Sequence, residues 1–274
     1  MSLSARPLVQ LTGSEDPRVL AAAAASPLVR VAELSEHADA EELHFREHIE
    51  PYEDGVTAAL GFFVRKRVLD YLDYALAKAK VRPHGTVVEL GAGSCWLSSA
   101  LACLDEVERV IAVEFSERRL TLIAPASIAL LDAPARKIER RVADFYASGL
   151  EPGTADLLVV DASFHHASDP ALFSRVCFEL TKPGGQVMLL REPTLALALR
   201  TRDHGIEADH GDFEHEYHRG EYVDFLAGAG FEARSVGVRW FHASGWRKLL
   251  YHPPLTLLSG PLRGQYVYVG RKPG

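Results

Sequence analysis

Residues 87–94 read Val-Val-Glu-Leu-Gly-Ala-Gly-Ser, an apolar run that meets two glycines separated by one residue. The apolar run predicts a buried strand, and the residues from Ser94 onward predict a helix. Because Gly91 and Gly93 have no Cβ, a ligand can approach the backbone there, and the first helical turn offers N–H groups without intrahelical partners. We interpret this segment as a nucleotide-type binding turn; the alternative is a structural turn with incidental glycines.

Short apolar runs alternate with amphipathic stretches along the rest of the chain. The predicted strands cover 86–90, 109–114, 137–142, 156–161, 186–191, 231–240 and 265–270, and the predicted helices cover 94–104, 116–131 and 170–180. Strands that alternate with helices of this length indicate parallel β-α-β units, and therefore an α/β fold. No helix is predicted between the last two strands, so we expect them to form an antiparallel pair.

Acidic residues follow several of these strands. Glu114 ends the second strand and precedes Phe115, Asp144 and Phe145 follow the third strand, and Asp161 ends the fourth. An acidic residue at the end of the second strand can accept hydrogen bonds from both hydroxyls of a ribose. The alternative for Glu114 is an exposed side chain at a strand end.

These motifs resemble the class I, Rossmann-like methyltransferases that use S-adenosylmethionine. The first motif of that family is an acidic residue followed by Gly-x-Gly, which residues 89–93 match, although Cys95 stands where a third glycine is often found. The resemblance covers about residues 85–192, with a weaker continuation over 214–231, and is greatest to the small-molecule tailoring branch. It implies a seven-stranded, mostly parallel sheet with helices on both faces, and S-adenosyl-L-methionine as the cofactor.

The resemblance also implies roles for individual residues. Gly91 and Gly93 are expected against the methionine part of the cofactor, Glu89 near its amino group, Glu114 at the ribose and Asp144 at the adenine amino group. The complete cofactor-binding set is Glu89, Gly91, Gly93, Glu114, Phe115, Asp144, Phe145 and Asp161.

Methyl transfer needs alignment of acceptor and methyl group more than a strong catalytic residue. If the acceptor is a hydroxyl or an acidic carbon, a base must remove a proton, and histidine suits that task near neutral pH. We expect His166 and His215 as candidate catalytic bases, and His165, Arg191 and Tyr217 as substrate-binding residues. The alternatives are a packing role for the histidines and a solvated arginine.

Composition sets further bounds on function. The 274 residues have a formal net charge of -7. The chain therefore lacks the excess of basic residues that is typical of nucleic-acid-binding proteins, and we expect no nucleic-acid partner. The three cysteines have no metal-ligand spacing, and no long apolar run marks a membrane span. We expect a cytoplasmic protein without a metal, and with a homodimer as one option. The histidines over 204–218 could supply metal ligands, but we favour a charged, solvated lid for this stretch.

Two domains are predicted: a helical lid or packing segment over residues 1–80, and a Rossmann-like methyltransferase domain over 81–274 with insertions at 195–219 and 241–264. The expected function is methylation of a small molecule, such as a natural product, sugar or lipid, with O-methylation favoured over N- or C-methylation.

The sequence also bears on three other functions. An NAD-dependent oxidoreductase is disfavoured because Trp96 stands at the third-glycine position of the dinucleotide fingerprint. A nucleic-acid base methyltransferase is disfavoured because residues 161–164, Asp-Ala-Ser-Phe, lack the two prolines of that family's motif. A cofactor-binding protein without activity, acting as a regulatory partner, remains open because fold alone does not establish catalysis.

Overall fold

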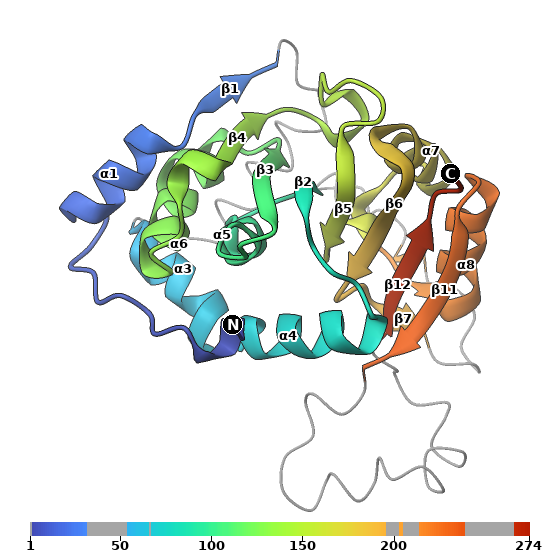
Figure 1. Ribbon diagram of the computed structural model, residues 1–274, viewed down its shortest axis with the longest axis horizontal. Helices are drawn as coiled ribbons and strands as arrows, with labels where there is room; N and C mark the ends of the chain where they lie inside the picture. Colours follow the sequence, from blue (N-terminus) through green and yellow to red (C-terminus); the bar gives the residue numbers. More distant parts are fainter. Residues whose placement is uncertain (1, 32–53, 66, 196–202, 205–213, 239–265) are drawn as a thin grey trace, which may run out of the picture.

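The computed structural model describes residues 2–31, 54–65, 67–195, 203–204, 214–238 and 266–274. Its centre is an eight-stranded sheet in the order β1-β4-β3-β2-β5-β6-β12-β11, in which β12 alone runs opposite to the other seven strands (Figure 1). The strands are β1 Leu28–Arg30, β2 Gly85–Leu90, β3 Val107–Glu114, β4 Ile138–Val142, β5 Ala155–Asp161, β6 Thr181–Leu190, β11 Glu232–Gly237 and β12 Tyr266–Arg271.

The predicted α/β alternation is confirmed, and the last two strands form the expected antiparallel pair. The predicted count of seven strands is wrong by one, because β1 joins the edge of the sheet parallel to β4, with Leu28 opposite Arg140. Three residues after Pro27 are too few to show a strand periodicity in the sequence. The fifth predicted strand also begins earlier than expected, at Thr181, because a register shift lets Pro183–Gly185 continue β6.

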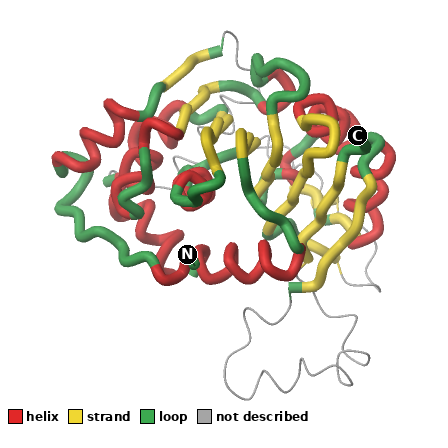
Figure 2. The backbone as a smooth tube through the Cα atoms, viewed as in Figure 1, coloured by secondary structure: helices red, strands yellow, loops and turns green. Residues whose placement is uncertain are grey.

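Helices cover both faces of the sheet (Figures 1 and 2). Alternate residues of β5 show why: Leu157 and Val159 belong to one buried cluster, and Leu158 and Val160 belong to the other. The first cluster includes residues of α1 Pro17–Ala25, α3 Gly55–Leu60, α4 Val68–Ala79, α5 Trp96–Ala102 and α6 Ala124–Leu130. The second includes residues of α7 Pro170–Leu180 and α8 Arg219–Gly228. An apolar strand buried on both faces is typical of a parallel sheet.

The helix predicted over 116–131 forms with a π-helical turn, Arg119–Ile123, that runs directly into α6. Before β2, α3 is followed by a π-helical turn, Gly61–Arg65, and then by α4. Arg67, just before α4, has a left-handed backbone with φ 48°. The short remaining elements are 3₁₀ turns at Leu3–Ala5, Ala135–Lys137, Phe145–Ala147 and Phe164–His166, and the two-residue strands β7 Thr194–Leu195, β8 Asp203–His204, β9 Glu214–His215 and β10 Tyr217–His218.

The N-terminal residues are bound to the sheet through a buried arginine. Arg140 of β4 is 4% exposed and donates to the carbonyl oxygens of Ala23, Ser26 and Leu120 over 2.6–2.7 Å. Burial lowers the pKa of this guanidinium. Since α4 also shares a core with the sheet, the boundary predicted at residue 80 is not visible as a break in packing and stays a prediction.

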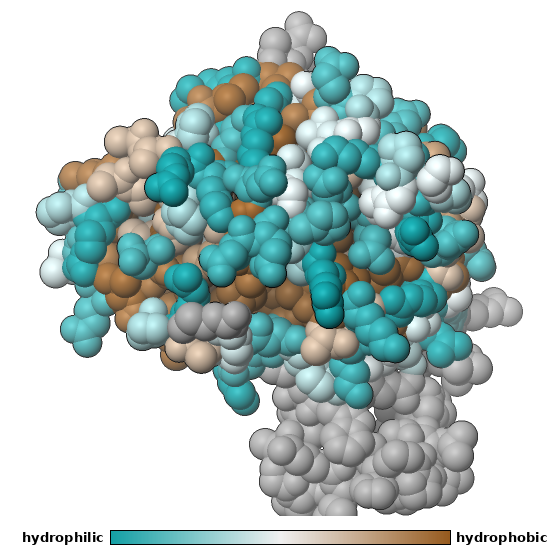
Figure 3. Space-filling model, in the orientation of Figure 1, coloured by the Kyte–Doolittle hydropathy of each residue, from teal (hydrophilic) through white to brown (hydrophobic). Residues whose placement is uncertain are grey.

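The surface is mainly polar on the face that Figure 3 shows. Among the described residues, the exposed large apolar side chains are Leu20, Val64 and Leu172, which lie on three different elements. No helix in the described ranges is long and apolar enough to cross a membrane. The predicted insertion at 241–264 lies outside the described residues, as do 196–202 and 205–213 of the insertion at 195–219.

Candidate active site

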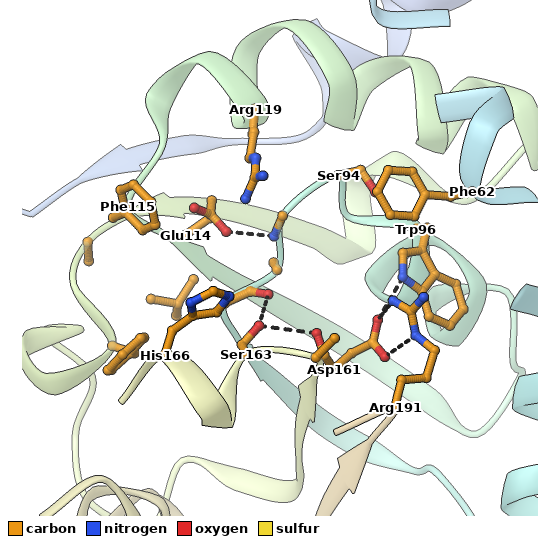
Figure 4. Close-up of a pocket in the computed structure, with 17 residues that line it drawn as sticks. Phe62, Ser94, Trp96, Glu114, Phe115, Arg119, Asp161, Ser163, His166 and Arg191 are labelled. Atoms are coloured by element: carbon orange, nitrogen blue, oxygen red, sulfur yellow. Dashed lines mark hydrogen bonds and ion pairs between the residues drawn. The ribbon is translucent and has the colours of Figure 1, made fainter. Parts of the chain in front are cut away.

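A cavity of about 220 Å³ opens at the carboxyl ends of β2, β3, β5 and β6 (Figure 4). Ligands of open α/β sheets bind in the crevice at this edge. The lining residues are Phe62, Gly91, Ala92, Gly93, Ser94, Trp96, Val113, Glu114, Phe115, Arg119, Ala143, Phe145, Asp161, Ala162, Ser163, His166 and Arg191.

The glycine turn after β2 forms one wall of the cavity. Gly91 and Gly93 have φ of +72° and +50°, a left-handed backbone that glycine adopts without strain. A Cβ on Gly91 would lie 2.4 Å from Ser163 Oγ, whereas a Cβ on Gly93 would have Arg119 Nη1, at 3.9 Å, as its nearest neighbour. Gly91 is therefore required by the protein's own packing, and Gly93 leaves open space for a ligand.

Glu114 lies at the end of β3 and is hydrogen-bonded to the glycine turn. Its carboxylate accepts from the Gly93 N–H at 2.6 Å and from the Ser116 N–H at 3.0 Å, and the residue is only 2% exposed. Each carboxylate oxygen has further acceptor capacity. Phe115 and Arg119 line the cavity near this carboxylate (Figure 4). This part of the cavity can therefore hold a ligand with hydroxyl donors and a flat ring.

An ion pair lies at another part of the cavity, where β5 and β6 end. Arg191 Nε is 2.6 Å from one carboxylate oxygen of Asp161, Arg191 Nη2 pairs with the other, and Trp96 Nε1 also donates to it at 2.8 Å. The Arg191 guanidinium lies 5.2 Å from the Trp96 ring centroid. Burial by itself lowers the pKa of Arg191, but the charge and hydrogen bonds of Asp161 outweigh it and raise that pKa. The cavity thus contains a fixed pair of opposite charges.

Glu192, the residue after Arg191, holds the turn that follows β5. Its buried carboxylate accepts from the backbone N–H groups of Ser163, Phe164 and His165 at 3.0–3.2 Å, and pairs with His165 Nδ1 at 2.8 Å. The His165 and His166 rings lie 4.1 Å apart between centroids. Sequence analysis missed Glu192, because all of its partners lie 27–29 residues earlier in the chain.

Eight of the predicted site residues line this one cavity: Gly91, Gly93, Glu114, Phe115, Phe145, Asp161, His166 and Arg191. Phe62 and Arg119 line it as well and were missed. Arg119 lies at the start of the helical segment after β3, and its position soon after the acidic strand end at Glu114 is a signal that the sequence contains. Phe62 comes from the N-terminal segment, and no local pattern indicates that contact.

Two predicted cofactor residues, Glu89 and Asp144, do not line the cavity. Glu89 is 1% exposed, accepts a hydrogen bond from Ser98 Oγ on α5, and has its pKa raised well above the usual value by burial. Asp144 accepts from the Tyr146 N–H at 2.8 Å, at the start of a 3₁₀ turn. Neither residue is among the lining residues, and their contact with a cofactor stays a prediction.

Three predicted acceptor-side residues also lie outside the lining. His165 is turned toward Glu192, while Tyr217 is 8% exposed and packs edge-on against Tyr222. The ring of His215 stacks on that of Tyr217 at 5.8 Å, and β9 contacts the Phe164–His166 turn. Within the described part of the chain, no group of three His, Cys, Asp or Glu side chains is placed to hold a metal.

Comparison with known proteins agrees with this geometry. Residues 88–189 match a protein family described as a methyltransferase domain. The sequence matches no curated protein. Residues 88–189 are therefore similar to a methyltransferase domain, and they lie on a Rossmann-like sheet. Fold and match both agree with the class I methyltransferases that the sequence resembles, whose cofactor is S-adenosyl-L-methionine.

Three similar solved structures illustrate the fold. Phosphoethanolamine N-methyltransferase 2 of Haemonchus contortus, in complex with S-adenosyl-L-methionine, is 12% identical, with 88% of this chain and 61% of that chain covered and a TM-score of 0.61. An S-adenosylmethionine-dependent methyltransferase from Mesorhizobium loti is 18% identical, with 71% and 94% covered and a TM-score of 0.51. The [4+2]-cyclase SpnF is 16% identical, with 76% and 82% covered and a TM-score of 0.55.

Proposed function

We propose that this protein transfers a methyl group from S-adenosylmethionine to a small-molecule acceptor. The observation that carries the proposal is the hydrogen bond between Glu114 and the backbone of Gly93, which joins the acidic strand end and the glycine turn into one cavity wall. A ligand that combines a ribose with a second, charged end suits this arrangement.

The adenosine of the cofactor is assigned to the Glu114 part of the cavity. Glu114 would accept hydrogen bonds from the ribose hydroxyls. Phe115 and Phe145, which line the cavity close by, would contact the adenine, and we retain Asp144 as the partner of its amino group. Gly93 fits this placement, since a side chain there would occupy the open space.

The amino-acid end of the cofactor is assigned to the Asp161–Arg191 pair. That end carries an ammonium and a carboxylate, which match a carboxylate and a guanidinium held side by side. This assignment replaces the expected role of Arg191 toward the acceptor with one toward the cofactor. The pair is supported by the Trp96 indole, which donates to Asp161 and lies beneath the guanidinium.

The bound cofactor supplies a methyl group already activated by its sulfonium charge. The protein's own residues then orient the reactants, and His166, whose ring points into the cavity, is the proposed base for a hydroxyl acceptor (Figure 4). For this reason we favour O-methylation over N- or C-methylation, with a natural product, sugar or lipid as the acceptor. His215, beside the turn that carries His166, is retained as a second candidate base.

A second function deserves a test because one structural neighbour is a cyclase, which shows that proteins of this fold need not be methyltransferases. Calorimetric titration with S-adenosylmethionine, followed by measurement of S-adenosylhomocysteine release in the presence of a small-molecule cell extract, separates the candidates. Binding with release supports methyl transfer. Binding without release on any extract supports a cofactor-binding protein without this activity, and absence of binding overturns both.

A further inference from the structure

The turn after β5 is held at two points by consecutive residues of the β6 end. Arg191 pairs with the Asp161 side chain before the turn, and Glu192 accepts from the backbone of Ser163, Phe164 and His165 within it. We propose that Glu192 is a positioning residue that sets the shape of the cavity at the charged end of the cofactor. This inference rests on the proposed function.

The chemistry of Glu192 explains why a carboxylate stands at this place. A buried carboxylate is costly unless it is hydrogen-bonded. Here three successive N–H groups at the start of a 3₁₀ turn, which have no partners within the turn, are satisfied by one side chain. The His165 Nδ1 contact fills the fourth acceptor position. An apolar side chain of similar size could pack there, but it would leave these donors without acceptors.

The position of this turn determines two walls of the cavity. Ser163 Oγ donates to the Gly91 carbonyl oxygen at 3.0 Å, so this turn is hydrogen-bonded directly to the glycine turn in the cavity wall. His166, at the end of the same turn, lines the cavity. Ala162, which connects Asp161 to the turn, has a left-handed backbone with φ 51°, a conformation that costs about 1–2 kcal/mol for a non-glycine residue. External contacts must therefore hold the turn in place.

Loss of the Glu192 carboxylate is expected to loosen the charged end of the cavity and to leave the adenosine end unchanged. Two probes distinguish these ends: S-adenosylhomocysteine carries the amino-acid group, and 5′-methylthioadenosine lacks it. Glu192→Gln keeps the size of the side chain but replaces one acceptor oxygen by an NH₂ group that faces N–H donors. We expect its Kd for S-adenosylhomocysteine to rise about tenfold, because the variant loses a charge-assisted hydrogen bond. Its Kd for 5′-methylthioadenosine should change less than about twofold.

The experiment combines calorimetry of both probes with amide hydrogen exchange. Glu139→Gln is the matched control, because Glu139 of β4 is a partly buried glutamate that pairs with Arg109 of β3 and Arg141 of β4, and it is not among the residues lining the cavity. In Glu192→Gln the amides of Ser163, Phe164 and His165 should exchange at least about tenfold faster than in wild type, and in the control they should not.

Equal weakening of both probes, or unchanged exchange at the three amides, overturns the positioning role. A wild-type protein that binds neither probe overturns the proposed function itself, a result distinct from failure of the variant alone. If Glu192→Gln does not fold, Ser163→Ala tests the same link at the glycine turn. It should weaken S-adenosylhomocysteine binding more than 5′-methylthioadenosine binding, and equal effects on the two would overturn the proposal.

Discussion

Replacement of Gly93 by alanine separates the cost of folding from the cost of ligand binding. The residue has φ +50°, and a new Cβ would meet no protein atom closer than Arg119 Nη1 at 3.9 Å. The folding cost is therefore that of a left-handed alanine, about 1–2 kcal/mol. In ligand binding the methyl group would occupy space assigned to the cofactor, and overpacking of that kind costs about 1–3 kcal/mol. At 1.4 kcal/mol for each factor of ten, the Kd should rise roughly fivefold to 140-fold.

Gly153→Ala is the matched control for this variant. Gly153 has a similar φ of +68°, its Cβ would meet no atom within 4 Å, and it stands before β5, at the edge of the sheet opposite the cavity. Urea unfolding and calorimetric titration with S-adenosylhomocysteine provide the two measurements. Both variants should lose similar stability, and only Gly93→Ala should lose affinity. Wild-type affinity in Gly93→Ala, or an equal loss in Gly153→Ala, would refute the reasoning.

Three further predictions concern stability. Trp96→Phe removes the indole N–H that Asp161 accepts and should lower the free energy of unfolding by about 1–3 kcal/mol, measured in urea; an unchanged midpoint would show that the bond contributes nothing. Arg140→Met removes the donor for the carbonyl oxygens through which the N-terminal residues are bound to the sheet, and should lower the free energy of unfolding by at least about 3 kcal/mol. An unchanged free energy of unfolding would show that those residues dock without Arg140. Burial raises the pKa of Glu89 well above its usual 4.5, so the folded state keeps a proton that the unfolded state releases as pH rises past that value. The wild type therefore loses stability as pH rises from 4.5 toward the folded pKa. Over that range the free energy of unfolding of Glu89→Gln should rise relative to that of the wild type, by at most about 1.4 kcal/mol per pH unit. A difference that is constant with pH contradicts the shift.

Much of the sheet could be predicted because each long strand carries its own signal. The alternation of predicted strands and helices, with no helix predicted before the last strand, specifies the strand directions, and both are local sequence patterns. By contrast, β1 is three residues long, and its place beside β4 depends on long-range contacts such as those of Arg140. The left-handed backbone at Arg67 and the π-helical turn within 116–131 likewise have no signal in the local sequence pattern.

The site shows the same division. Gly91, Gly93, Glu114 and Asp161 could be found because glycines and acids at strand ends are recognisable in one sequence. The direction in which each side chain points could not be found in the same way. Glu89 is an example, because its side chain lies in the core against Ser98. The contacts of Glu192 join segments far apart in the sequence.

Arg191 shows what the structure adds to a residue that the sequence indicates near the site. It lines the cavity, and its bidentate pairing with Asp161 is the observation from which we propose a common role of the two residues toward the cofactor. Only the proximity of the β5 and β6 ends makes that pairing visible.

The most direct test of methyl transfer uses S-adenosylmethionine that carries a trideuterated methyl group, incubated with the protein and a small-molecule extract. The proposal predicts that one extract compound gains a single labelled methyl group while an equal amount of S-adenosylhomocysteine appears, and that Gly93→Ala slows both together at limiting cofactor. Tight cofactor binding with no labelled product and no S-adenosylhomocysteine would contradict the proposal.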